Sequence, residues 1–119
     1  MLLQTNTYLV PAERREEHAR LVRRMADVLK RLGCEHFEVH EEINPDGTIP
    51  PAYSRFVQIL RFRDRQHYQL VRSAEAADPA AQELVAEFCA LIDLPAQQQQ
   101  GTFSVSFLNA VLPPPAARA

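Results

Sequence analysis

The sequence lacks three features that would each point to a class of function. Two cysteines in 119 residues are too few for a disulfide scaffold and fit a reducing cytoplasm. No apolar run approaches the ~20 residues that a membrane-spanning helix needs, and the N-terminus has neither the basic leader nor the cleavage site of a signal peptide. With a net charge of −2, the chain has no basic excess to attract nucleic acid or an anionic membrane. We therefore expect one cytoplasmic domain without a nucleic-acid or membrane partner.

The chain does contain a clear succession of strand and helix patterns. Strands are predicted over residues 2–10, 34–43, 54–63 and 102–111, and helices over 12–32 and 65–77, the second helix restarting at Asp78–Pro79. Pro95 is expected to end that helix, and the run QQQQ at 97–100 to form a short polar loop. The segment NPDGTIPP at 44–51 is rich in turn formers and joins the second and third strands as a long-looped hairpin.

This order of elements predicts the fold. Each helix carries an apolar stripe, and the chain offers only a sheet for both stripes to cover. The order β–α–β–β–α–β is that of a ferredoxin-like α+β domain, and two right-handed β–α–β units give a four-stranded antiparallel sheet in the order 4-1-3-2. We expect the domain to occupy residues 1–112 and a disordered Pro/Ala tail to occupy residues 113–119.

The third predicted strand indicates a second copy of the chain. Phe56, Leu60 and Phe62 lie on one side of it, and Val57 and Ile59 lie on the other. Helices cover one face of the sheet only, so one of these apolar sets faces away from them. A second sheet packed on that face would bury it, which predicts a homodimer with two-fold symmetry.

At this level the chain resembles the dimeric α+β barrel superfamily, which includes antibiotic-biosynthesis monooxygenase-like and NIPSNAP-like proteins. The resemblance spans residues 3–111 and rests on two stretches, TYLVPAERREEHARLV and FVQILRFRDRQHYQLVRSAEAADP, together with the final strand after a break. It implies that two sheets face one another and enclose a cavity. It also implies a range of activities, since the superfamily contains cofactor-free oxygenases, haem-degrading enzymes and small proteins of unknown role.

The haem-degrading branch of that superfamily is a poor match. Its members carry an Asn on the first strand, a Trp, and an axial His on the second helix. Asn6 stands where that Asn would be, but the chain has no Trp, and His67 comes too early in the second helix. Because two of these three residues are missing or misplaced in the chain, the comparison argues against haem, and we expect no cofactor.

The stretch GCEHFEVHEEI at 33–43 allows three interpretations. Cys34, His36 and Glu38 share one face of a strand and are near enough in pairs to share a divalent metal with ligands from elsewhere, whereas His36 and His40 stand ~13 Å apart and cannot chelate together. In the second interpretation this is an edge strand, whose glutamates prevent edge-to-edge pairing. In the third, His36 and His40 face a small-molecule cavity. We assign no metal and leave the other two interpretations open.

A cavity would draw its polar groups from several strands if their polar faces coincide. The candidate catalytic residues are His36 and His40 as general bases, with Asn6 and Tyr8 to hold a developing oxyanion. The candidate ligand-binding residues are Gln58, Arg61, Ser104, Ser106 and His67. Arg61 would pair with Glu38 or bind an acidic ligand, and His67 and Tyr68 would guard the cavity mouth or form a solvated first helical turn.

Two functions remain open from the sequence. The first is a cofactor-independent, monooxygenase-like enzyme acting on a small lipophilic or aromatic compound held in the barrel. The second is a non-catalytic ligand-binding or structural dimer. A cavity with polar partners favours the first, and a barrel plugged by phenylalanines favours the second.

Overall fold

The computed structural model describes residues 1–115 and confirms the predicted order of elements. Its elements are β1 (Leu2–Pro11), the 3₁₀ helix η1 (Ala12–Arg14), α1 (Arg15–Arg31), β2 (His36–Glu41), β3 (Tyr53–Phe62), α2 (Arg65–Ala77), α3 (Pro79–Ile92), α4 (Leu94–Gln100) and β4 (Ser104–Asn109). The antiparallel sheet has the order β2-β3-β1-β4, which is the predicted order read from the other edge. The ferredoxin-like α+β fold is therefore confirmed. The predicted disordered tail falls partly on residues 116–119, outside the described residues, and stays a prediction.

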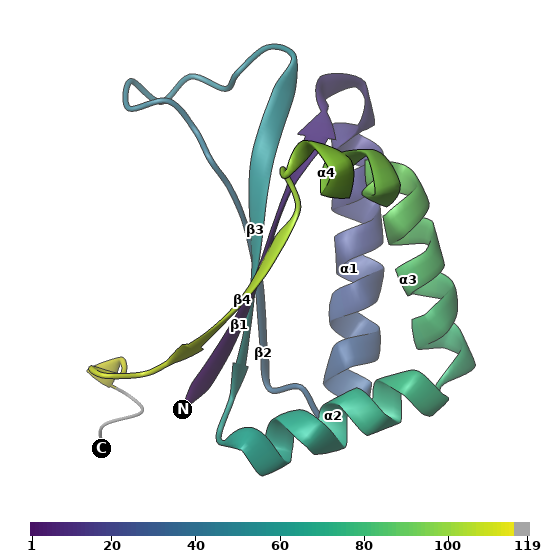
Figure 1. The fold of residues 1–119 in the computed structure, drawn as a ribbon, viewed down its shortest axis with the longest axis vertical. Coiled ribbons are helices and arrows are strands. Elements are labelled where there is room, and N and C mark those ends of the chain that lie inside the picture. Colours follow the sequence, from purple (N-terminus) through teal and green to yellow (C-terminus); the bar gives the residue numbers. More distant parts are fainter. Residues whose placement is uncertain (116–119) are drawn as a thin grey trace.

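The helices cover one face of the sheet. Figure 1 shows α1 and α3 lying side by side along that face, with α2 running across their ends and α4 leading back to the sheet. The opposite face carries no helix. Within residues 1–115, no helix is both long and apolar enough to cross a membrane.

The pairing register decides which side chains face the helices. Tyr8 on β1 pairs with Phe56 on β3, and Asn6 pairs with Gln58, so these four side chains share one face. Tyr8 and Phe56 are buried against the helices, which makes this the inner face. The outer face carries Leu3, Thr5, Thr7 and Leu9 from β1, Arg55, Val57, Ile59 and Arg61 from β3, His36, Glu38 and His40 from β2, and Ser104, Ser106 and Leu108 from β4.

The buried side chains form two clusters rather than one. The first joins one end of the sheet to α1 and α3 and consists of Tyr8, Val10, Leu21, Phe56, Leu84, Phe88, Leu91 and Ile92. The second lies toward α2 and consists of Leu29, Cys34, Leu60, Phe62 and Val71. The middle of the inner face, between the two clusters, is occupied by Asn6 and Gln58.

The expectation that residues 97–100 form a polar loop was wrong. Asp93 adopts a left-handed backbone with φ 54° and separates α3 from α4, and Pro95 stands in the first turn of α4 rather than ending a helix. Gln97 is buried, and its amide pairs with the backbone of Leu9 through two hydrogen bonds of 2.8 Å. Since β4 pairs with β1 only up to Thr7, the Gln97 amide continues the sheet edge where β4 ends.

Replacing Gln97 with Ala is expected to lower the free energy of unfolding by about 2–3 kcal/mol, because it leaves buried backbone groups of Leu9 and Ile92 without their partner. Urea denaturation measures the loss. Gln98→Ala is the matched control, since Gln98 is exposed on the same helix. Equal effects of the two substitutions would show that the Gln97 amide does not secure the edge of β1.

Candidate functional site

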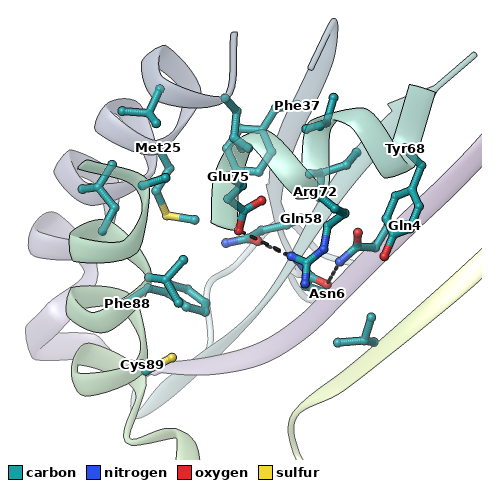
Figure 2. Close-up of a pocket in the computed structure, with 18 of the residues that line it drawn as sticks. Gln4, Asn6, Met25, Phe37, Gln58, Tyr68, Arg72, Glu75, Phe88 and Cys89 are labelled. Atoms are coloured by element: carbon teal, nitrogen blue, oxygen red, sulfur yellow. Dashed lines mark hydrogen bonds and ion pairs between the residues drawn. The ribbon is translucent and has the colours of Figure 1, made fainter. Parts of the chain in front are cut away.

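A cavity of about 340 Å³ lies between the inner face of the sheet and the helices. Its walls come from both core clusters, including Phe88 and Leu84 of the first and Leu60, Phe62 and Val71 of the second. The cavity therefore separates the two clusters. Figure 2 shows Met25 and Phe88 on one side and Tyr68 on the other, with polar groups between them.

The β4 side of the cavity is partly exposed to solvent. Val105 and Phe107 line the cavity but are 44% and 52% exposed. Tyr68 of α2 makes an edge-on contact with Phe107, the ring centroids being 5.5 Å apart. This aromatic contact joins α2 to β4 at the cavity wall.

A row of carboxamides forms the polar wall of the cavity. Gln4 donates to Asn6 over 3.0 Å, and Asn6 donates to Gln58 over 3.0 Å. Gln58 in turn donates to the hydroxyl oxygen of Tyr8 over 3.1 Å. All three amides line the cavity, and the chain of hydrogen bonds satisfies groups that would be costly to bury alone.

Tyr8 and His18 anchor this chain at its buried end. The Tyr8 hydroxyl lies 2.7 Å from Nε2 of His18, and both side chains are almost completely buried. Burial lowers the pKa of His18 to about 4, so the ring is neutral near pH 7. Burial also raises the pKa of Tyr8, so the phenol keeps its proton. The Tyr8 hydroxyl thus accepts from Gln58 and also pairs with Nε2 of His18.

A charged pair from α2 reaches the same cavity. Nη1 of Arg72 lies 3.4 Å from Oε1 of Glu75, and both residues line the wall. Figure 2 shows this ion pair as a dashed line between Arg72 and Glu75. Sequence reasoning missed both residues. Their spacing with Tyr68 and Val71 is that of one helix face, and this periodicity was the available signal.

The structure brings together three of the predicted site residues. Asn6 and Gln58 line the cavity, and Tyr8 supports them from behind through its hydrogen bond to Gln58. Their roles as catalytic or ligand-binding residues stay predictions. What the structure adds is that the cavity lies within a single chain, between sheet and helices, whereas the expected cavity lay between two sheets.

The other strand residues predicted for the site lie on the opposite face of the sheet. His36, His40 and Arg61 point outward from β2 and β3, and Ser104 and Ser106 point outward from β4. The polar faces of the strands therefore do not coincide, and these five residues share no cavity with Asn6 in one chain. Their position is on the face that the sequence predicts to pack against a second copy.

The charges of β2 pair with those of β3, as expected of a charged edge strand. Oε1 of Glu38 lies 3.3 Å from Nε of Arg61, and its Oε2 lies 3.1 Å from Nε2 of His40. The hydrogen bond from His40, with further help from Arg61, holds the pKa of Glu38 below its usual range. The predicted edge position of β2 and the predicted Arg61–Glu38 ion pair are both confirmed.

His67 differs from both of its predicted settings. It is buried rather than solvated, and it does not line the cavity. Its Nδ1 accepts from the backbone N–H of Arg63 over 3.1 Å, and its Nε2 donates to the carbonyl of Gly33 over 2.8 Å. Both ring nitrogens are therefore engaged in joining α2 to the turn after α1, which leaves neither for a ligand.

The metal interpretation of Cys34, His36 and Glu38 is not supported by their directions. Cys34 is buried in the second core cluster, and burial raises the pKa of its thiol. His36 is exposed and Glu38 faces outward, so the three side chains do not converge. Among residues 1–115, no three His, Cys, Asp or Glu side chains are placed to share a metal ion.

Solved structures share this architecture over nearly the whole chain. A NIPSNAP domain protein from Burkholderia xenovorans is 18% identical with a TM-score of 0.63, covering 96% of this chain and 99% of its own. A structure described as an antibiotic biosynthesis monooxygenase is 16% identical with a TM-score of 0.62, covering 94% and 100%. A dimeric ferredoxin-like protein of unknown function from Jannaschia sp. is 13% identical with a TM-score of 0.57, covering 92% and 100%.

The likeness is one of fold. No family model matches the chain, and no curated protein matches its sequence. The structural resemblance to NIPSNAP and antibiotic-biosynthesis monooxygenase proteins that the sequence indicated is confirmed at this level. At these identities the activity of this chain has to be argued from its own cavity.

The buried His18 predicts a specific loss of stability in acid. Its pKa is about 4 in the folded protein and near 6.5 when unfolded, so the unfolded chain binds more protons between these values. The free energy of unfolding should fall by about 1.4 kcal/mol per pH unit as the pH drops through this window. Denaturant titrations at several pH values measure this slope.

In His18→Gln the slope between pH 6.5 and about 5 should be lost, because the buried imidazole that takes up a proton on unfolding is gone. His36→Gln, which changes an exposed histidine, should keep the wild-type slope. A slope that persists in His18→Gln would mean that another group is responsible.

Proposed function

We propose that this protein binds a small lipophilic or aromatic compound in the cavity between its sheet and its helices. The observation that carries this proposal is the cavity itself, with mostly apolar walls and one row of carboxamides. Its volume of about 340 Å³ lies in the range of small-molecule sites, which are typically apolar with a few placed polar groups. The free Cys34 and Cys89 support the expected reducing, cytoplasmic setting.

The arrangement of the polar wall supports a ligand that carries an oxygen. Each carboxamide nitrogen has two N–H groups, and the chain from Gln4 to Tyr8 uses one at each residue. The second N–H of Asn6 or Gln58 is then available to a carbonyl, phenolate or similar oxygen. An apolar body would contact Met25 and Phe88 while its oxygen meets the amides.

A cofactor-independent, monooxygenase-like enzyme is the second candidate. The observation that favours it is the same amide row, because fixed donors stabilise the oxyanion of a bound substrate when it ionises. The shared fold of a structure described as an antibiotic biosynthesis monooxygenase supports the same idea. Binding alone returns the compound unchanged, whereas oxygenation consumes dioxygen.

Fluorenone and fluorene are suitable probes for the cavity, since they share a rigid tricyclic shape and only fluorenone carries an oxygen. We expect both to bind, fluorenone more tightly, by NMR titration. In Cys89→Trp the indole should fill the cavity and weaken binding of both at least about tenfold. Ala86→Trp is the matched control, since Ala86 is exposed on the same helix.

Equal binding by wild type and Cys89→Trp would place the probes elsewhere and contradict the proposed site. Dioxygen uptake with 2-hydroxyfluorene, a phenol of the same tricyclic shape that can ionise to an oxyanion, separates the two candidates. Uptake of dioxygen that depends on the protein and falls in Asn6→Ala supports the enzyme, and its absence supports the binding protein.

The protein is also proposed to be a homodimer that pairs the outer faces of two sheets. Val57 and Ile59 of β3 and Leu3 and Leu9 of β1 give the outer face an apolar centre that no helix covers. Arg61 and Glu38 form a charged border at the β2 edge. A related fold that is described as a dimeric ferredoxin-like protein supports the same assembly.

Ile59→Lys is expected to convert the dimer to a monomer. Each protomer contributes one new lysine, so two unpaired positive charges would be buried in the apolar interface. Analytical ultracentrifugation measures the molecular mass. Leu70→Lys is the control, since Leu70 is exposed on α2 and its replacement should leave the dimer intact. A wild-type protein that sediments as a monomer would contradict the proposed assembly.

A further inference from the structure

One carboxylate lies in the mostly apolar wall of the cavity, where the surrounding packing gives no reason for a charged group. Of the described residues that line the cavity, Glu75 is the one acid. Its side chain is 18% exposed, so it is largely removed from water. Figure 2 shows its carboxylate among the polar side chains that line the cavity, beside the Arg72 guanidinium.

Arg72 offsets the charge of Glu75 but pairs with only one of its two carboxylate oxygens. The guanidinium is half exposed at the rim and contacts only Oε1, over 3.4 Å. That distance is longer than the usual 2.7–2.9 Å of a close charge-assisted hydrogen bond. Oε2 of Glu75 has no hydrogen-bond partner among the described residues, so it is available to a bound molecule.

The amide row provides the complementary group on the sheet side. Asn6 and Gln58 are held in place by the chain that ends at Tyr8 and His18, and each has a second amide N–H to offer. A ligand oxygen that accepts these N–H groups has its neighbouring carbon in the space between the sheet and α2. Glu75 projects into that space from the α2 side (Figure 2).

We propose that the cavity is a proton-transfer site for lipophilic ketones, with Glu75 as general base and the amides of Asn6 and Gln58 as donors to the enolate oxygen. The proposal rests on the proposed binding function. Glu75 takes a proton from the carbon next to the carbonyl. The C–H electron pair becomes a C=C bond, and the carbonyl π pair moves to the oxygen, which the amides stabilise.

Return of the proton from Glu75 closes the cycle. Delivery to the same carbon regenerates the ketone, and in a conjugated enolate delivery to a remote carbon gives the isomer. No electrons are gained or lost, and no oxidant, reductant or cofactor takes part. The chemistry requires only a base, fixed hydrogen-bond donors and an apolar cavity that limits the access of water.

The probe is 2-tetralone in deuterated buffer, whose protons next to the carbonyl exchange for deuterium through the enolate. We expect wild-type protein to accelerate this exchange, followed by the loss of the corresponding NMR signals. Glu75→Gln should slow the protein-dependent exchange about a hundredfold while binding 2-tetralone within about threefold of wild type. Glu75→Asp should retain part of the activity, because it keeps a carboxylate.

Two further variants separate the base from its surroundings. Glu16→Gln removes an exposed carboxylate of α1 that does not line the cavity and should leave exchange unchanged. Asn6→Ala should slow exchange at saturating 2-tetralone, because the enolate loses a donor. Thermal unfolding of Glu75→Gln and Asn6→Ala confirms that each variant is folded before its rate is compared.

The outcomes distinguish this proposal from the binding function. Binding of 2-tetralone without faster exchange overturns proton transfer and leaves the binding function intact. Binding of fluorene but not of 2-tetralone overturns the ketone class. Exchange that persists in folded Glu75→Gln overturns the role of Glu75, and failure of every probe to bind overturns the binding function itself.

Discussion

The hydrogen bond between Asn6 and Gln58, in the middle of the buried face of the sheet, is the interaction on which the rest of the structure depends. The two residues are directly paired across β1 and β3, where two apolar side chains would be expected under the helices. Their amides require partners, and these come from Gln4 at one end and Tyr8 with His18 at the other. Without that chain, each amide would be a buried polar group at a cost of about 1–3 kcal/mol.

The amide pair also divides the core. Phe56 and Tyr8 pack with α1 and α3 on one side of it, and Leu60 and Phe62 pack with Val71 on the other. Helices that bridge both clusters cannot close fully over the polar centre, and the cavity occupies that space. The same residues that interrupt the apolar core thus create the volume and the polar wall of the candidate site. The division of the core and the candidate site are in this way two consequences of one sheet position.

The fold could be predicted from the sequence because it rests on periodicity. The apolar stripes of the helices require a sheet to cover, and the right-handed crossovers fix the strand order. The faces of β1 could not be predicted in the same way. Gln4 and Asn6 have the polarity of a solvent-facing row, yet the structure turns them toward the helices and leaves Leu3 and Leu9 outside. Only a tertiary hydrogen-bond chain makes that choice favourable, and three of its four hydrogen bonds join residues that are 10 to 52 positions apart.

The positions of Gln97, Arg72 and Glu75 could not be predicted from the sequence either, because they too depend on tertiary contacts. Gln97 belongs to a run of four glutamines that are chemically alike, and only the position of β1 beside α4 selects it for burial. Arg72 and Glu75 have the spacing of a solvated ion pair on a helix surface, and the sequence does not reveal that α2 crosses the ends of the other helices and directs this face to the cavity.

The four histidines illustrate why residue type alone is a weak guide to chemistry in this chain. His18 and His67 are buried, and their ring nitrogens hold Tyr8 and the backbone of Arg63 and Gly33 in place. His36 and His40 lie on the outer face of the edge strand, away from the cavity. Histidine is the usual first choice for a general base, because its ordinary pKa is close to neutral pH. Here the fold uses two histidines for structure and directs the other two away from the cavity, and the carboxylate that faces the amide row is Glu75.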